Sequence, residues 1–94
     1  MKFDVIETDN RIYLLKNELI LNISEINKKS LVIENKLLDI YAVGLNLAEA
    51  ENDFFVQFDF TYRRLLCVAD KKLSKHLLDA KKYINLLVDK VKDK

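Results

Sequence analysis

The sequence has no proline, a single glycine and a single cysteine among its 94 residues. Glycine and proline normally supply about 7% and 5% of a chain, and they form tight turns or end helices. Their scarcity favours long helices joined by short polar connections. Cys67 cannot form an internal disulfide, and the N-terminal segment lacks a basic start followed by an apolar run and a small-residue cleavage site. The sequence therefore predicts a cytoplasmic protein.

The residue patterns of common catalytic and ligand sites are also missing. Gly44 is the only glycine, which excludes the glycine-rich loops that bind nucleotides. His76 is the only histidine and has no cysteine pair near it, so a zinc or iron site would lack ligands. Cys67 has no base beside it to activate a thiolate, and the acidic run at 49–53 does not match a calcium loop. We therefore expect a protein that is not an enzyme and that has no catalytic residue, no metal, no cofactor and no small-molecule substrate.

No run reaches the ~18 uninterrupted apolar residues of a membrane span, because Asn, Glu, Lys or Asp interrupts each one. A membrane is therefore not an expected partner. Half of the residues are hydrophobic, which suffices for one core in a chain of this length. A single domain over residues 1–94 is predicted.

Charge is distributed unevenly along the chain. Residues 1–60 carry six basic and eleven acidic side chains, net −5, whereas residues 61–94 carry ten and four, net +6. The two parts together give the net charge of +1. Such asymmetry indicates binding to a polyanion or pairing with an acidic surface.

The segment from residue 53 to residue 68 contains all but one of the phenylalanines and is the expected centre of the core. As a helix, at about 100° per residue, it has one broad apolar face and a second, smaller one on the far side. As a strand it alternates well, but the alternation stops at Arg63, whereas the helical pattern continues. A helix is predicted. Its broad face holds Phe54, Phe55, Phe58, Tyr62, Leu65, Leu66 and Ala69, and its far face holds Val56, Phe60 and Cys67.

The N-terminal part has two interpretations. Residues 1–9 indicate an extended lead-in or a short strand. Residues 10–27 have apolar positions at helical spacing and are apolar nearly all round, which predicts a helix buried on several sides. The alternative is a hairpin of residues 11–15 and 18–23, although its turn lacks the Asn-Gly or Asp-Gly pair typical of hairpins.

A further helix is predicted from about Leu31 to Glu51, with Ser30 as its N-cap. Gly44 and Ala48 would lie four residues apart on its apolar face. Glycine inside a helix costs about 1 kcal/mol against alanine. We expect Gly44 either to admit a closely packed neighbouring helix or to mark a kink.

The C-terminal part shows the most regular pattern. Apolar residues recur at spacings of four, three, four, three and four, a heptad seam that lasts less than three heptads. It predicts a helix packed in a bundle, and residues 70–72 form either a bend before it or part of one longer helix. The seam consists of Leu73, Leu77, Ala80, Ile84, Leu87 and Val91.

Together these patterns predict an all-α fold, a compact bundle of three or four helices. The alternative is a small α+β domain with an N-terminal hairpin and a strand near residues 54–63. By elimination, the predicted function is that of a non-catalytic protein–protein interaction module, such as an adaptor, an assembly factor or an inhibitor of a larger complex.

Two features of the predicted helices suggest partners. Apolar surface left over at Val56, Phe60, Leu78 and Leu86 predicts self-association as a homodimer. Arg64, Lys71, Lys75 and Lys82, at spacings of seven, four and seven, would form a basic stripe. Acidic residues interspersed on this stripe favour an acidic protein partner, and nucleic acid bound by the basic C-terminal helix is the alternative. The predicted partner-binding residues are Val56, Phe60, Arg64, Lys71, Lys75, Leu78 and Lys82.

Overall fold

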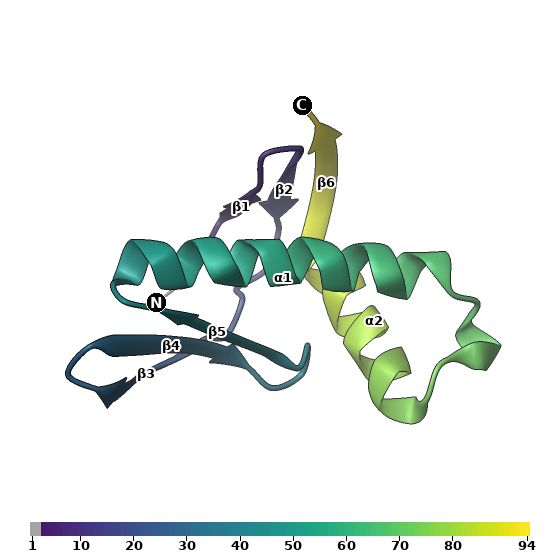
Figure 1. The fold of residues 1–94 in the computed structure, drawn as a ribbon. Helices are drawn as coiled ribbons and strands as arrows, with labels where there is room; N and C mark the ends of the chain where they lie inside the picture. Colours follow the sequence, from purple (N-terminus) through teal and green to yellow (C-terminus); the bar gives the residue numbers. More distant parts are fainter. Residues whose placement is uncertain (1–2) are drawn as a thin grey trace.

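A computed structural model describes residues 3–94, and it shows an α+β fold (Figure 1). The predicted all-α bundle of three or four helices is therefore wrong. Residues 3–94 form six strands and two α-helices, with a short 3-10 helix between the helices. The elements are β1 Val5–Glu7, β2 Arg11–Leu15, β3 Asn22–Asn27, β4 Ser30–Asn35, β5 Ile40–Gly44, α1 Leu47–Cys67, η1 Asp70–Lys72, α2 Lys75–Leu87 and β6 Val88–Asp93.

The strands form two antiparallel sheets of three strands each. Sheet A has the order β1-β2-β6 and joins the two ends of the chain, whereas sheet B has the order β3-β4-β5 and is built from consecutive strands. Helix α1 runs between the sheets, with sheet A above it and sheet B below it in Figure 1. Its buried side packs on β5 and β4 of sheet B and on Tyr13 of β2. The buried side of α1 therefore contributes to one core that contacts both sheets.

Strands β2 to β5 replace the helices predicted for residues 10–27 and 31–51, and only residues 47–51 of the second are helical, as the start of α1. Polar side chains close these turns in place of glycine and proline. Asn27 Oδ1 accepts a hydrogen bond from Lys29 N at 2.8 Å between β3 and β4, and Thr8 Oγ1 accepts one from Arg11 N at 3.2 Å between β1 and β2. Asn and Thr form such turns through their own side chains. The scarcity of glycine and proline therefore did not exclude hairpins.

The alternative that the sequence offered, a small α+β domain, has the correct fold class, but its predicted elements are wrong. Residues 11–15 do form a strand, but it pairs with β1 and β6, and residues 22–27 pair with β4. There is consequently no hairpin of residues 11–15 with 18–23. Residues 54–63 are helical and not a strand. The short strand predicted within residues 1–9 is present as β1, and residues 1 and 2 lie outside the described part of the chain.

Helix α1 confirms the helical interpretation of the aromatic segment, although it begins at Leu47. The Asn46 side chain caps it by accepting a hydrogen bond from Glu49 N at 2.9 Å. Phe54, Phe58 and Leu65 are buried, whereas Phe60 on the far face is 66% exposed. The two faces of the helical wheel thus correspond to a core side and a solvent side.

The C-terminal part contains two elements. Helix α2 places Ala80, Ile84 and Leu87 of the predicted seam in the core, but Val91 belongs to strand β6. The chain bends at η1, so the continuous helix considered for residues 70–72 is wrong and the bend is correct. Neither α1 nor α2 combines the length and the apolar character that crossing a bilayer requires.

At Gly44 the first turns of α1 approach sheet B closely. Gly44 lies in β5 and not in a helix, so it is not a helix kink. A Cβ atom placed on Gly44 would lie 2.2 Å from Ala50 N and 2.8 Å from Glu49 Cβ. The close packing expected at this residue is therefore present, but between a strand and the first turns of α1. No side chain fits between them.

Replacing Gly44 with alanine should push α1 away from β5. We expect Gly44→Ala to lose about 3 kcal/mol of unfolding free energy, because a methyl group forced against backbone atoms cannot be accommodated by side-chain movement. Urea denaturation measures the loss. Ser24→Ala, on the exposed strand β3, is the matched control and should change stability by less than about 0.5 kcal/mol. A Gly44→Ala protein as stable as the wild type would contradict this packing.

Candidate interaction groove

A groove of about 380 Å³ lies between α1, the first turn of α2 and the turn that joins β4 to β5. Leu38 and Leu65 are buried at its base. Val56 and Phe60 line it from α1 and are 55% and 66% exposed. Large apolar side chains with this exposure, beside a concave surface, are typical of interaction sites. Its other lining residues are Asp39, Gln57, Thr61, Arg64 and Leu77.

The β4–β5 turn is held in place by Asn35, the one buried polar side chain among residues 3–94. Its Oδ1 accepts a hydrogen bond from Leu38 N at 2.9 Å, and its Nδ2 donates to the carbonyl oxygen of Ile20 at 2.8 Å. Buried amide groups that are satisfied in this way fix their surroundings, because breaking one bond leaves an unpaired polar atom. Asn35 therefore fixes the base of the groove at Leu38.

Asp39 ends this turn with a φ of 55°, the left-handed region. It is the only non-glycine residue with positive φ among residues 3–94. Aspartate tolerates this conformation better than most residues, but β-branched side chains do not. The turn therefore constrains the residue type at a wall of the groove.

The charges at the groove are available to a partner. Arg64 and Asp39 both line it and are exposed, and neither forms an ion pair with any residue of the described chain 3–94. The neighbouring Arg63 is different, since its Nε lies 3.2 Å from Asp59 Oδ2. The groove thus combines an apolar base with one free guanidinium and one free carboxylate.

A polar network on the other side of α1 fixes the helix to sheet A. Tyr13 of β2 is fully buried, and its hydroxyl donates to Asp59 Oδ1. Arg11 Nη1 donates to the same hydroxyl at 3.5 Å, and Arg11 also pairs with Asp93 of β6 at 3.2 Å. Burial, and then the hydrogen bond to Asp59, raises the pKa of Tyr13 to about 12. The tyrosine therefore stays neutral and keeps donating to the carboxylate.

Only part of the predicted partner-binding set gathers at the groove. Val56, Phe60 and Arg64 line it together. Lys71 lies on η1. The other three residues, Lys75, Leu78 and Lys82, lie on α2, about 100° or more around that helix from the groove residue Leu77. The basic stripe is not continuous, because α1 ends at Cys67 and the chain bends before α2 begins.

The partner-binding residues predicted from the sequence did not include Leu38, Asp39, Leu77 or the α1 residues Gln57, Thr61 and Leu65. The first two were hidden by the helix predicted for residues 31–51. A signal was present, since Asn35 and Lys36 follow one apolar run and Asp39 precedes the next. Polar residues at both ends of a short segment between apolar runs are typical of a turn.

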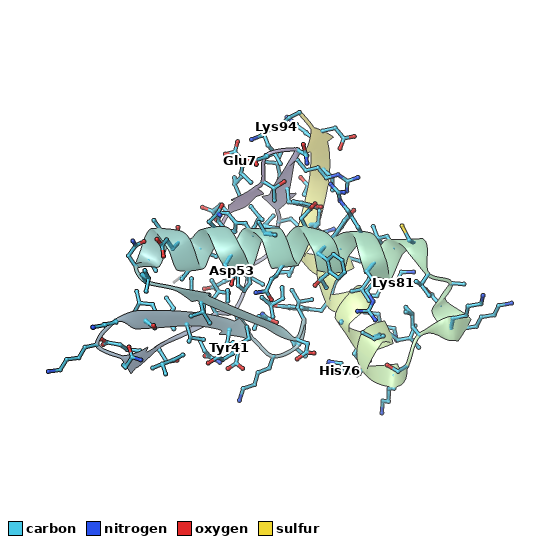
Figure 2. The ribbon with its side chains drawn as sticks, viewed as in Figure 1. Glu7, Tyr41, Asp53, His76, Lys81 and Lys94 are labelled. Carbon is cyan, nitrogen blue, oxygen red and sulfur yellow. The ribbon has the colours of Figure 1, made fainter. Side chains whose placement is uncertain are left out.

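Comparison of the chain with protein-family models, curated proteins and solved structures finds no match. The groove is therefore interpreted from its own chemistry. Within residues 3–94, no three His, Cys, Asp or Glu side chains are grouped as a metal ion would require. His76 lies exposed at the outer end of α2, away from α1 (Figure 2).

The raised pKa of Tyr13 makes stability depend on pH in the alkaline range. The unfolded chain loses this proton near pH 10, whereas the folded chain retains it until about pH 12. The stabilisation is complete below pH 10 and is lost as the pH rises through 12. We expect near-ultraviolet titration to show a tyrosinate that appears only near pH 12 and is absent from Tyr13→Phe. Tyr41→Phe, at an exposed residue, should retain it; a late transition that survives Tyr13→Phe would contradict the assignment.

The conformation of Asp39 gives a second expectation. Asp39→Gly and Asp39→Asn should change the unfolding free energy by less than about 0.5 kcal/mol, because both residues accept positive φ. Asp39→Val should lose about 1–2 kcal/mol, since a β-branched side chain collides with the backbone in this region. Chemical denaturation of the three variants measures the order. A valine variant as stable as the glycine variant would show that the turn is not left-handed at this residue.

Proposed function

We propose that this chain is a non-catalytic interaction module that binds an acidic segment of a partner protein in the groove between α1 and α2. The observation that carries the proposal is Phe60, which is 66% exposed beside a formed groove. Aromatic side chains in such positions supply much of the binding energy of protein interfaces. An adaptor, an assembly factor or an inhibitor would each use a groove of this kind. The proposed compartment is the cytoplasm, which the free thiol of Cys67 supports.

Asp39 and Arg64 place one charge of each sign in the groove, and the exposed lysines beyond it make the surrounding charge positive, which supports an acidic occupant. Arg64 lines it without an ion pair among residues 3–94, and a guanidinium binds a carboxylate through two parallel hydrogen bonds. Lys71, Lys75 and Lys82 are exposed on η1 and α2 and add positive potential at this end of the molecule. Such a field steers an acidic partner toward the groove and raises its association rate. Leu78, half-buried on α2, extends the apolar surface beyond the groove.

Nucleic acid is the second candidate partner, and the exposed lysines are the observation that favours it. Lys71, Lys75 and Lys82 form no ion pair among residues 3–94, so they are free to contact phosphates. Lys81 is not free to contact phosphates, since its Nζ pairs with Asp70. Each phosphate contact would add about 0.9 to the slope of log affinity against log salt concentration. The broken stripe leaves few aligned contacts, so we favour the protein partner.

Substitution of Phe60 tests the proposal. The chain and its Phe60→Glu variant are used as baits in extracts of the native cell, and each captured protein is then purified and titrated against both. We expect a partner that loses affinity by about thirtyfold or more with Phe60→Glu, since a charge replaces a central aromatic anchor. Leu86→Glu is the matched control, because Leu86 is 62% exposed and lies about half a turn around α2 from Leu77. Equal affinity of all three proteins for every partner would refute the groove as the binding site.

Charge variants, compared with Phe60→Glu, decide between the two partner classes. Arg64→Gln should weaken the protein partner and flatten the salt dependence of its binding. Purified duplex and single-stranded nucleic acid are titrated in parallel with the wild type and with a variant in which Lys71, Lys75 and Lys82 are changed to Gln. Tight binding of nucleic acid at moderate salt that is lost in this triple variant, with no effect of Phe60→Glu, would make nucleic-acid binding the function.

A further inference from the structure

The two sheets have four edge strands, and three of these are closed to further pairing. In sheet A, β1 has only three residues, and four of the six residues of β6 are charged. Short edges and charged edges both oppose the addition of another strand. In sheet B, α1 covers the free side of β5 with two side chains: Val43 N donates to Asp53 Oδ2, and Gln57 Nε2 donates to the carbonyl oxygen of Tyr41, both at 3.0 Å.

Strand β3 is the fourth edge; it is longer than β1, less charged than β6 and not covered by α1, and its pairing with β4 is irregular only at its end, between Glu25 and Asn27. All six of its residues are exposed, and only Glu25 among them is charged. It lies along the outer rim of sheet B, on the side away from α1 (Figure 1). Its edge is lined with apolar side chains, since Ile20, Ile23 and Ile26 are 66%, 41% and 56% exposed. An uncovered apolar edge of this kind is a template for strand pairing.

The register of sheet B determines which backbone groups β3 offers. Residues of an antiparallel strand direct their N–H and C=O groups alternately toward and away from a neighbour. Val43 directs its N–H away from β4, toward α1. Val32 lies opposite Val43 and therefore directs its N–H and C=O groups toward β3. Its partner there is Ser24, which directs its own N–H and C=O groups toward β4. The residues on either side of Ser24 consequently direct their N–H and C=O groups outward.

The same alternation continues into the segment that precedes β3. The carbonyl oxygen of Ile20 accepts from Asn35 Nδ2, so it points toward β4 and not outward. Leu21, Ile23 and Glu25 are left with outward backbone groups. No hydrogen bond of these three outward groups to another part of residues 3–94 is seen. Three alternate residues with outward backbone groups are enough for a short antiparallel ladder.

When two copies of the segment around Ile23 are aligned antiparallel, their side chains are complementary to one another. In an antiparallel pair centred on Ile23, Ile20 of one copy meets Ile26 of the other, and Ile23 meets itself. In the same register Glu18 of one copy corresponds to Lys28 of the other, and both lie beyond the ladder, Glu18 before β3 and Lys28 in the β3–β4 turn. Both of these side chains are exposed and form no ion pair within residues 3–94. A pair centred on Glu25 would instead place two carboxylates opposite each other, which is destabilising.

We propose that two copies of the chain associate through β3, antiparallel and centred on Ile23, and so join their B sheets into one six-stranded sheet. The outward groups of Leu21, Ile23 and Glu25 form about six backbone hydrogen bonds across the twofold axis. The isoleucines bury one another, and the two pairs of Glu18 with Lys28 beyond the ladder favour this register. A single strand pair buries less surface than most stable interfaces do, so the association depends on concentration. This surface is separate from the groove, because β3 and β5 are opposite edges of sheet B.

Proline at residue 23 tests the ladder. The N–H of Ile23 points outward, so Ile23→Pro removes an intermolecular donor and leaves the bonds between β3 and β4 intact. Sedimentation velocity over a range of concentrations should show a wild-type dimer whose dissociation constant rises about tenfold or more in Ile23→Pro. Ile23→Val keeps the donor and should lose less affinity. Circular dichroism checks that the proline variant is folded.

Charge exchange tests the register and does not depend on the proline variant. Glu18→Lys and Lys28→Glu each place like charges at both ends of the pair, so each variant alone should dimerise about three to ten times more weakly at low salt. Mixed in equal amounts, the two variants should form a heterodimer with wild-type affinity, because opposite charges then meet at both ends.

Three results would overturn the proposal. One is a wild-type chain that stays monomeric at the highest soluble concentration. Another is a dimer that neither Ile23→Pro nor the charge variants weaken. The third is a dimer that Phe60→Glu abolishes, which would place self-association at the groove. Loss of partner binding by Phe60→Glu with the dimer unchanged would separate the two surfaces.

Discussion

Helix α1 can rest on β5 only because Gly44 has no side chain, and the rest of the structure depends on this contact. A Cβ at that residue would lie within 2.2 Å of Ala50 N. With the first turns of α1 seated there, Phe54 and Phe58 enter the core. Asp53 and Gln57 then reach the free edge of β5, and Figure 2 shows Asp53 on the side of α1 that faces sheet B.

The contact at Gly44 also determines where the exposed face of α1 points. Once one side of the helix is fixed on sheet B, Val56 and Phe60 project beside the β4–β5 turn. The bond from Tyr13 to Asp59 fixes α1 to sheet A as well, so the helix cannot roll. An interaction surface on an element held from two sides loses little conformational entropy on binding. The exposed aromatic ring of Phe60 therefore lies on a helix that both sheets hold in place.

The sequence predicted the part of the fold where a single period dominates. The helical period of residues 53–68 was strong enough to place Phe54, Phe58 and Leu65 inside and Val56 and Phe60 outside. Residues 10–51 were misassigned because their apolar residues fit a helix as well as buried strands, and periodicity alone does not separate the two. The turns were missed because Asn27 and Thr8 form them without glycine.

The site could be predicted only where it belongs to one helix. Val56, Phe60 and Arg64 share a face of α1, so their proximity follows from spacing. Leu38 and Leu77 come from other elements, and their approach depends on strand order and on the bend at η1. The basic stripe failed for the same reason, since it assumed an unbroken helix from Arg64 to Lys82.

Sheet A joins segments from opposite ends of the chain, and this has a consequence for how the protein folds. Strands β3 to β5 and α1 are neighbours in sequence and can assemble through short loops. Strand β6 must instead find β2, with Arg11 opposite Asp93, and so closes a loop of nearly the whole chain. The entropy of that closure is lost before the contacts form, so such pairing is slow. We expect the amides of β2 and β6 to gain protection from hydrogen exchange last during refolding, after a nucleus of β3 to β5 and α1.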